Sequence, residues 1–391
     1  MKAICWQGKK DLRCEEVPDP ILQDPKDAII RVTSTCICGS DLHLMNGFVP
    51  TMCPGDVMGH EAMGEVVAVG AEARAGGLSV GDRVVIPFQM TCGACEQCLA
   101  GNFSVCQVTN RNADLASAFF GDTTAGLFGY SHITGGYAGG QAEYLRVPFA
   151  ATTAIKVPQS GADEKYLFLS DILPTGWQAA KFADIQPTDT VAVWGCGPVG
   201  LFTILSALAQ GAKRVIAIDD VPERLQMAEG LGAEILDRSQ EKVLPTLKEW
   251  TGGHGPEKCI DAVGIEAHGP TPLLELIDRA QTAVKLETER PVALREAIMA
   301  CKSAGTVSVP GVYGGLSNMI PTGALMNKGL TLRTGQTHVR RWSEELLRRI
   351  DEGEIDPTFL ITHTEPLSRG PEMYKTFRDK RDGCVKVVLK P

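Results

Sequence analysis

The sequence predicts an α/β protein with two unlike domains, one a barrel-like antiparallel β domain and the other built on a doubly wound parallel sheet. The chain has 391 residues, which is too many for a single hydrophobic core. Short β-branched runs separated by glycine and proline fill its first third, as in antiparallel barrels. From about residue 171, strand-like and helix-like segments alternate, which is typical of a parallel sheet with helices on both faces.

The first domain is expected over residues 1–170. Its clearest strands are predicted at 28–33, 64–69 and 83–87. No long amphipathic helix interrupts them. The chain is expected to return to this domain over residues 333–391, where a last strand is predicted at 384–389.

The second domain is expected over residues 171–332. Strands are predicted at 191–194, 214–218, 258–263 and 306–309, and helices at 198–210, 222–230 and 291–301. More than twenty residues separate the third of these strands from the helix at 291. Connections of this kind are usually about 2–6 residues long. We therefore expect an insertion at about 265–290, with a short helix that starts near Thr271.

Composition and charge exclude several classes of protein. The chain is 44% hydrophobic and 22% charged, as in ordinary globular proteins, and its net charge is −9. Without a basic block, nucleic acid and anionic membranes are poor partners. The first ten residues hold no apolar core of signal-peptide length, which favours a cytoplasmic protein. The uncharged stretch 190–212 is interrupted by glycine and proline, so a strand, a turn and a helix are expected there instead of a membrane span.

A dinucleotide-binding motif follows the predicted strand at 191–194. The residues there are Gly195-Cys196-Gly197-Pro198-Val199-Gly200. The three glycines allow a tight turn, close approach to a pyrophosphate and close packing of helix on strand, as in a Rossmann fold. Asp219 follows nineteen residues after Gly200, where it could accept hydrogen bonds from the adenosine ribose. Asp220 adds negative charge that would repel a 2′-phosphate, so NAD is favoured over NADP.

Four of the thirteen cysteines are crowded into one segment at about 90–108. Cys92, Cys95, Cys98 and Cys106 have the spacing C-x2-C-x2-C-x7-C. In a reducing compartment, clustered cysteines favour a metal over disulfides. Four thiolates can close a tetrahedral structural zinc site. An iron–sulfur cluster and free buried cysteines are the alternatives.

Three further motifs carry residues that can hold a metal. Cys38-Gly39-Ser40-Asp41-Leu42-His43 follows a predicted strand, Gly59-His60-Glu61 precedes one, and Asp171 lies where the two domains join. Each could be an ordinary core residue when taken alone. Together with the four cysteines and the glycine motif, and in this order, they resemble the zinc-containing medium-chain alcohol dehydrogenases. The likeness covers nearly the whole chain outside 265–290 and is greatest for the formaldehyde dehydrogenase-like branch.

The resemblance implies a GroES-like catalytic domain joined to a Rossmann domain that binds NAD. It implies two zinc ions per chain, one structural and one catalytic, with Cys38, His60 and Asp171 as the catalytic ligands. Glu61 would be a carboxylate that can reach the metal during exchange. Ser40 and His43 would carry the proton away.

The resemblance also implies the binding residues for cofactor and substrate. Phe88 would line the substrate pocket. The cofactor would contact Gly39, Thr175, Gly195, Gly197, Pro198, Val199, Gly200, Asp219, Arg224, Val263 and Lys386. Two positions depart from the family: many members have cysteine at the position of Asp171, and some have a basic residue at that of Gly39. The first change replaces soft sulfur by harder oxygen, and the second removes a cationic contact to the pyrophosphate.

The expected activity is therefore zinc-dependent hydride transfer between NAD and a small alcohol or hydrated aldehyde, with formaldehyde as one candidate. The nicotinamide is expected in the cleft between the domains. One alternative is a dismutase that retains NAD between turnovers, and another is a redox sensor that binds NAD without catalysis. The resemblance implies a homodimer or homotetramer.

Overall fold

The computed structural model describes residues 1–265, 291–314, 317 and 319–391. The described chain forms two compact units, Met1–Pro174 with Thr337–Pro391, and Thr175–Gln336. Most of the predicted insertion, including the helix expected near Thr271, lies outside the described residues.

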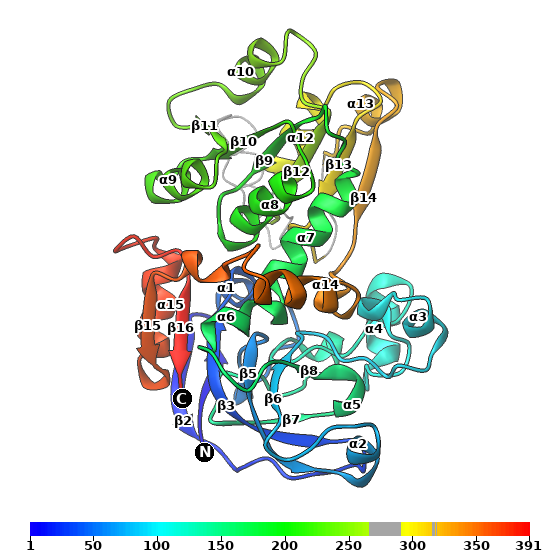
Figure 1. The fold of residues 1–391 in the computed structure, drawn as a ribbon, viewed down its shortest axis with the longest axis vertical. Coiled ribbons are helices and arrows are strands. Elements are labelled where there is room, and N and C mark those ends of the chain that lie inside the picture. Colours follow the sequence, from blue (N-terminus) through cyan, green and yellow to red (C-terminus); the bar gives the residue numbers. More distant parts are fainter. Residues whose placement is uncertain (266–290, 315–316, 318) are drawn as a thin grey trace. The chain divides into compact units, whose positions relative to one another are not determined.

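The first unit is built on a seven-stranded sheet (Figure 1). Its strands, in the spatial order β15-β16-β3-β5-β6-β8 with β7 also beside β3, are β15 His363–Pro366, β16 Val387–Lys390, β3 Ala28–Ile37, β5 Ala62–Val69, β6 Arg83–Ile86, β8 Ile155–Lys156 and β7 Tyr144–Val147. All pairs are antiparallel except β15 with β16. The three strands predicted in the first third are confirmed. Buried Ile30, Val32, Val66 and Val84 pack in its core.

A smaller sheet and short helices complete the first unit. The sheet has the order β2-β1-β4, with β1 Lys2–Gly8, β2 Asp11–Glu16 and β4 Asp56–Val57. The α-helices are α1 Gly39–Asn46, α2 Ala71–Ala75, α3 Glu96–Leu99, α4 Ala113–Phe120, α5 Ala150–Thr153, α6 Glu164–Leu167, α14 Val339–Asp351 and α15 Gly370–Arg378. The 3-10 helices are η1 Phe103–Val105, η2 His132–Thr134, η3 Phe168–Ser170, η4 Pro357–Leu360 and η5 Leu367–Arg369. Apolar residues of α1 and α15 share one core cluster, which fixes α1 at the end of β3.

The second unit is a six-stranded parallel sheet. Its spatial order is β11-β10-β9-β12-β13-β14, with β11 Glu234–Asp237, β10 Arg214–Asp219, β9 Thr190–Trp194, β12 Lys258–Asp261, β13 Thr306–Val309 and β14 Thr331–Thr334. The order reverses beside β9, which is the arrangement of a doubly wound dinucleotide-binding sheet. The predicted fold class is confirmed for both units.

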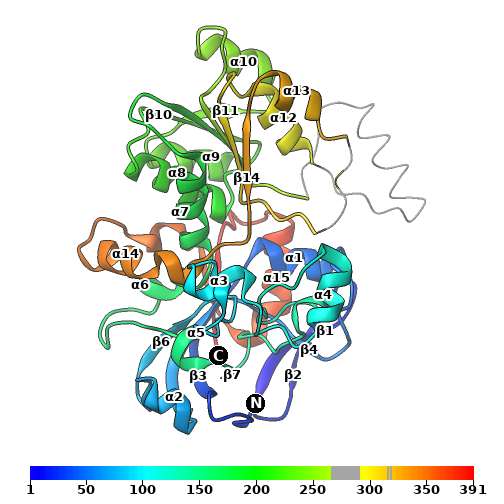
Figure 2. The same cartoon turned by 90° about the vertical axis from the view of Figure 1, so that its right-hand side faces the viewer.

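Helices cover both faces of this parallel sheet (Figure 2). They are α7 Ile172–Ala183, α8 Pro198–Ala209, α9 Pro222–Gly230, α10 Val243–Trp250, α12 Val292–Ala300 and α13 Thr322–Asn327. Helices α8 and α9 lie against one face, and α10 and α12 share a core cluster with the other. The uncharged stretch 190–212 forms β9 and α8, as predicted. No helix of the described residues is long and apolar enough to cross a membrane.

Two strand boundaries differ from the sequence prediction for local reasons. Strand β12 ends at Asp261 because its carboxylate accepts hydrogen bonds from the N–H groups of Val263 and Gly264, which turn the chain. The last strand, β16, begins at Val387, because the chain turns at Cys384, whose N–H donates to the Arg381 carbonyl. Element ends depend on such single contacts, which hydrophobic periodicity does not report.

Candidate active site

The structure brings together Cys38, His60 and Asp171, which come from distant parts of the first unit. Cys38 follows β3 and precedes α1, His60 precedes β5, and Asp171 lies between η3 and α7. The Asp171 carboxylate is 3.2 Å from His60 Nε2 and 3.8 Å from Cys38 Sγ. All three side chains are buried. We call Cys38, His60 and Asp171 the buried trio.

The donors of the buried trio fit a divalent zinc ion. With Glu61 they form a group whose ligand atoms all lie within 4.8 Å of one another. Burial alone would lower the pKa of His60, but neighbouring Asp41 and Cys38 outweigh it and raise that pKa well above its usual value. The neighbouring Asp41 carboxylate therefore favours positive charge at His60. A thiolate, an imidazole and a carboxylate are ligands that zinc accepts, and three of them leave one position open.

Asp41 holds His60 in place from behind. Its Oδ1 lies 2.9 Å from His60 Nδ1. Its Oδ2 accepts hydrogen bonds from the Cys38 N–H at 3.0 Å and from the Gln141 side-chain amide at 3.1 Å. With Asp41 beside Nδ1, the Nε2 lone pair of His60 is available for a metal. A carboxylate at the second ring nitrogen is the usual support for a histidine ligand. Sequence reasoning assigned no role to Asp41, although its place three residues after Cys38 in the first turn of α1 was a usable signal.

Lys386 pairs with Glu61 in the interior of the first unit. Both side chains are fully buried, and the Lys386 Nζ also donates to the Ile37 carbonyl at 3.0 Å. Burial alone would lower the pKa of Lys386, but Cys36 and Glu61 outweigh it and raise that pKa. The other Glu61 oxygen, Oε1, is buried and has no hydrogen-bond partner among the described residues. Such a carboxylate oxygen, next to the buried trio, fits a nearby cation.

The residues expected to relay a proton lie on α1. Ser40 is half-buried and His43 is buried one turn later, so the two occupy neighbouring positions on the helix surface. Gly39 is the first residue of the same helix and is half-buried. All three thus lie within five residues of the buried trio's Cys38.

Two aromatic rings flank His60. The Phe88 ring is edge-on to the imidazole at a centroid distance of 6.4 Å, and the Tyr130 ring is edge-on at 6.2 Å. Burial raises the pKa of Tyr130, so its hydroxyl stays protonated. Phe88, which is expected to line the substrate pocket, thus lies beside a residue of the buried trio. Sequence reasoning missed Tyr130, because the loops at 110–136 carry no periodic pattern.

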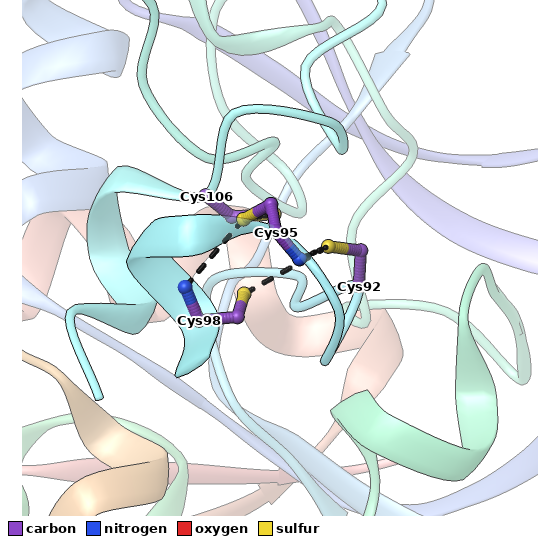
Figure 3. Close-up of side chains that lie close together, drawn as sticks. All are labelled: Cys92, Cys95, Cys98 and Cys106. Atoms are coloured by element: carbon purple, nitrogen blue, oxygen red, sulfur yellow. Dashed lines mark hydrogen bonds between the residues drawn. The ribbon is translucent and has the colours of Figure 1, made fainter. Parts of the chain in front are cut away.

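The four clustered cysteines, Cys92, Cys95, Cys98 and Cys106, lie close together in the first unit, and we call the segment that carries them the four-cysteine lobe (Figure 3). Their side chains turn toward one another around α3. The Cys92 and Cys98 sulfurs are 3.9 Å apart, and so are those of Cys95 and Cys106. These are hydrogen-bond distances between free thiols, too long for disulfides. Zinc–sulfur bonds of about 2.3 Å in a tetrahedron would give sulfur separations of about 3.8 Å, so the lobe fits zinc.

Backbone N–H groups donate hydrogen bonds to cysteine sulfurs of the lobe and so favour the thiolate form. Burial alone would raise the pKa of Cys95, but N–H donors from Cys98 and Gln107 outweigh it and lower that pKa to about 6. The Cys95 N–H in turn donates to the Cys92 sulfur at 3.3 Å. Such N–H donors stabilise thiolates, which are the form that binds metal.

The glycine motif of the second unit has the shape that its sequence predicts. Gly195 has φ 88°, a left-handed conformation that favours glycine. A Cβ at Gly200 would lie 1.8 Å from the Gly195 carbonyl oxygen, so the first turn of α8 can approach β9 only with glycine there. Gly197 caps α8, and Pro198 and Val199 begin it. Backbone N–H groups at a helix start of this kind can hold a phosphate.

The acid expected at the ribose lies at the end of β10. Asp219 accepts hydrogen bonds from the backbone N–H of Cys196 at 2.6 Å and from that of Val221 at 3.0 Å, which ties the glycine turn to the strand end. An Arg224 guanidinium nitrogen lies 3.7 Å from the Cβ position of Gly197, near the glycine turn.

The remaining predicted cofactor residues fall into two groups. Val263 follows β12 and packs against Gly195, and Thr175 lies in α7. These residues therefore belong to the second unit, whereas Gly39 and Lys386 belong to the first. Lys386 has no exposed surface, so a direct pyrophosphate contact would require the Glu61 pair to rearrange.

Comparison with known proteins shows which family has this architecture. The alcohol dehydrogenase GroES-like domain matches residues 24–159, and the zinc-binding dehydrogenase domain matches residues 198–284. An uncharacterized zinc-type alcohol dehydrogenase-like protein, AdhB, of Bacillus subtilis is 42% identical over 395 residues, with all of both chains covered. The chain belongs to the zinc-type alcohol dehydrogenase family. It is thus a member of the medium-chain NAD(P)-dependent oxidoreductases.

Other members of the zinc-type alcohol dehydrogenase family are similar along most of their length. A glutathione-independent formaldehyde dehydrogenase of Pseudomonas aeruginosa is 34% identical over 373 residues, which cover 89% of this chain and 87% of that protein. The solved alcohol dehydrogenase TADH of Thermus sp. ATN1 is 33% identical with a TM-score of 0.81, and the match covers 100% of this chain and 99% of that one. The resemblance to this family and to its formaldehyde dehydrogenase-like members is confirmed.

Proposed function

We propose that this chain is an NAD-dependent zinc enzyme that oxidises small primary alcohols or hydrated aldehydes, with hydrated formaldehyde as one candidate substrate. The observation that carries the proposal is the convergence of the buried trio beside Glu61. The formaldehyde dehydrogenase of Pseudomonas aeruginosa among its relatives supports the formaldehyde candidate.

Cys38, His60 and Asp171 would hold the catalytic zinc. The ion would supply a Lewis acid that polarises the substrate oxygen. The chain's own part is to fix the ligands. Asp41 Oδ1 lies 2.9 Å from His60 Nδ1, and Asp41 Oδ2 accepts a hydrogen bond from the Cys38 N–H, so both ligands would be oriented before a metal arrives.

Phe88 and Tyr130 would exclude water and bound the substrate. Their rings stand edge-on to His60. Two rings so close to a metal ligand would restrict the substrate to a small molecule with little branching. The Ser40 hydroxyl and the His43 imidazole, both on α1, would relay the released proton away from the metal.

The second unit would bind NAD, which supplies the hydride acceptor. The α8 start would hold the pyrophosphate, and Asp219 would accept from the ribose hydroxyls. Asp220 is exposed directly beside it, so a ribose 2′-phosphate would meet two carboxylates. This charge favours NAD over NADP. The four-cysteine lobe would hold the second, structural zinc.

The experiment is a substrate and cofactor screen with purified enzyme. Formaldehyde, simple alcohols and aromatic alcohols are offered with NAD or NADP, with and without glutathione. We expect NAD-linked turnover of small substrates that glutathione does not enhance. Turnover only with NADP would contradict the Asp219 and Asp220 argument, and no turnover with any alcohol or aldehyde would contradict the proposed reaction.

A dismutase with retained NAD is the second candidate, since it would use the same metal site. It predicts cofactor absorbance in the purified, dialysed protein and aldehyde consumption without added NAD. A redox sensor without catalysis would bind NAD and turn over nothing. The same purified sample therefore separates the three.

A further inference from the structure

A second mixed cluster of metal-binding side chains lies on the first unit. The Cys53 thiol, the Asp56 carboxylate and the His132 imidazole each place a donor atom within 4.8 Å of the other two. Cys53 is exposed, and the other two residues are half-buried. We call these three residues the surface trio. None of them lies in the motifs that carry the family resemblance.

Backbone hydrogen bonds fix Cys53 and Asp56 relative to each other. The Cys53 N–H donates to Asp56 Oδ2 at 2.7 Å, and the Asp56 N–H donates back to the Cys53 carbonyl at 3.1 Å. Asp56 also begins β4 and pairs with Trp6 of β1. One carboxylate oxygen is thus occupied by the turn, and the other, Oδ1, faces outward to His132.

His132 reaches the same place from a segment 76 residues later in the chain. Its Nε2 lies 3.1 Å from Asp56 Oδ1. Its helix, η2, is held there because the Ile133 N–H donates to the Thr51 hydroxyl at 3.2 Å and the Asn112 side chain donates to the His132 carbonyl at 2.8 Å. The three donors are therefore held by independent contacts on both sides.

The separations suit a metal after a small adjustment. Ligands at 2.0–2.3 Å from a tetrahedral zinc ion lie about 3.3–3.7 Å from one another. The His132 nitrogen and Asp56 oxygen are already close to this separation. The Cys53 sulfur is exposed on a single rotatable bond, so it can close the remaining gap without backbone movement. Sulfur and imidazole nitrogen disfavour Mg²⁺ and Ca²⁺, which prefer oxygen ligands.

We propose that the surface trio is a third metal site of the chain, which takes a divalent ion of the zinc class with water at the fourth position. Binding releases the Cys53 thiol proton, and the His132 ring proton moves to Nδ1 so that Nε2 can ligate. The ion links the turn at 53–56 to η2. Because Tyr130 lies two residues before His132, the same link braces the segment that carries a ring beside His60.

Cobalt titration of the full-length protein tests the site, after the protein has been given two equivalents of zinc per chain for the buried trio and the four cysteines and freed of excess metal. Co²⁺ replaces zinc in such donor sets and gives a thiolate-to-cobalt charge-transfer band. We expect one added equivalent of Co²⁺ to produce this band in the reduced wild-type protein. Cys53→Ser should abolish the band, and His132→Gln should weaken Co²⁺ binding at least about tenfold.

Two variants control the experiment. His363 lies 3.5 Å from Asp382, and this pair belongs to no metal-binding group with a thiol among the residues that the structure describes, so His363→Gln should leave the band intact. Asp56→Asn keeps an oxygen acceptor for the Cys53 N–H, so it should weaken binding without unfolding the turn. A wild-type protein without the band, or a Cys53→Ser protein with the full band, would overturn the proposal. Neither readout depends on turnover, so the result is independent of the proposed function.

Discussion

The first unit offers a metal the same three donor types in two places, the buried trio Cys38, His60 and Asp171 and the surface trio Cys53, Asp56 and His132. The two trios differ in the residues that contact their ligands. The buried histidine has Asp41 at its second nitrogen, and Glu61 with its Lys386 partner lies next to it. In the surface trio, the carboxylate beside the histidine is itself a proposed ligand.

This comparison shows how one donor set can serve two purposes. A buried site excludes water and keeps unbalanced negative charge, so it holds its metal tightly and makes that metal an effective Lewis acid. An exposed site shares its ion with solvent and exchanges it readily. The buried trio is therefore suited to catalysis, and the surface trio to reversible bracing of two segments.

The largest expected effect separates the two thiols. Cys38→Ser should lower turnover about 1000-fold relative to Cys53→Ser, because loss of the Lewis acid removes several kcal/mol of transition-state stabilisation. Binding of NAD to the Cys38→Ser protein should persist, since the glycine turn and Asp219, which are proposed to hold the cofactor, lie in the second unit. Steady-state kinetics and NAD titration measure both. Similar turnover in the two variants would remove the distinction between the trios.

The next largest effect concerns the buried Lys386–Glu61 ion pair, which lies next to the buried trio and has no counterpart described at the surface trio. Lys386→Met leaves Glu61 buried without its cation, which should lower the free energy of unfolding by about 3–5 kcal/mol. Adding Glu61→Gln to Lys386→Met should recover part of this loss, because the charge is then gone. Urea unfolding of the single and double variants gives the answer. Equal stability of Lys386→Met and wild type would show that the pair carries little energy.

A smaller effect is expected when Asp41, the carboxylate beside His60 Nδ1, is replaced. Asp41→Asn should weaken zinc affinity at the buried trio by about 10–100-fold, with the fold retained. Asp56→Asn is the matched control, since it removes a carboxylate from the surface trio. Competition with a coloured chelator measures both. An Asp41→Asn protein that keeps wild-type affinity would show that His60 needs no such support.

The smallest effect concerns the four-cysteine lobe. There, backbone N–H groups stabilise the thiolate form of a cysteine. In metal-free protein, the Cys95 pKa of about 6 means that this thiol is largely ionised at pH 7. Because that pKa is depressed, its contribution to stability is present at high pH and is lost as the pH falls through about 6. Iodoacetamide at pH 7 should label Cys95 ahead of Cys92, as read by peptide mass spectrometry. Preferential labelling of Cys92 would contradict the assignment.

The parts of the molecule that follow from local sequence could be predicted. Strand β9, the glycine turn and α8 were predicted because glycine and proline interrupt an uncharged run. The buried trio's residues lie in three short motifs far apart in the sequence, and it is the resemblance to the zinc-containing medium-chain alcohol dehydrogenases that implies their convergence.

The parts that depend on long-range packing could not. Lys386 was expected at the cofactor, yet it is buried against Glu61, 325 residues away, a pairing that no local pattern encodes. Tyr130 lies in a loop without periodicity, and its position beside His60 depends on packing of that loop. The surface trio joins two loops 76 residues apart and belongs to no motif.

The central claim is that the buried trio holds the catalytic zinc. Anomalous diffraction at the zinc edge from crystals of the full-length protein tests it most directly. We predict one peak bonded to Cys38, His60 and Asp171 and another among the four cysteines, with or without a weaker peak at the exchangeable surface trio. A peak among the four cysteines alone, with His60 donating to Asp171 and no density between them, would contradict the account.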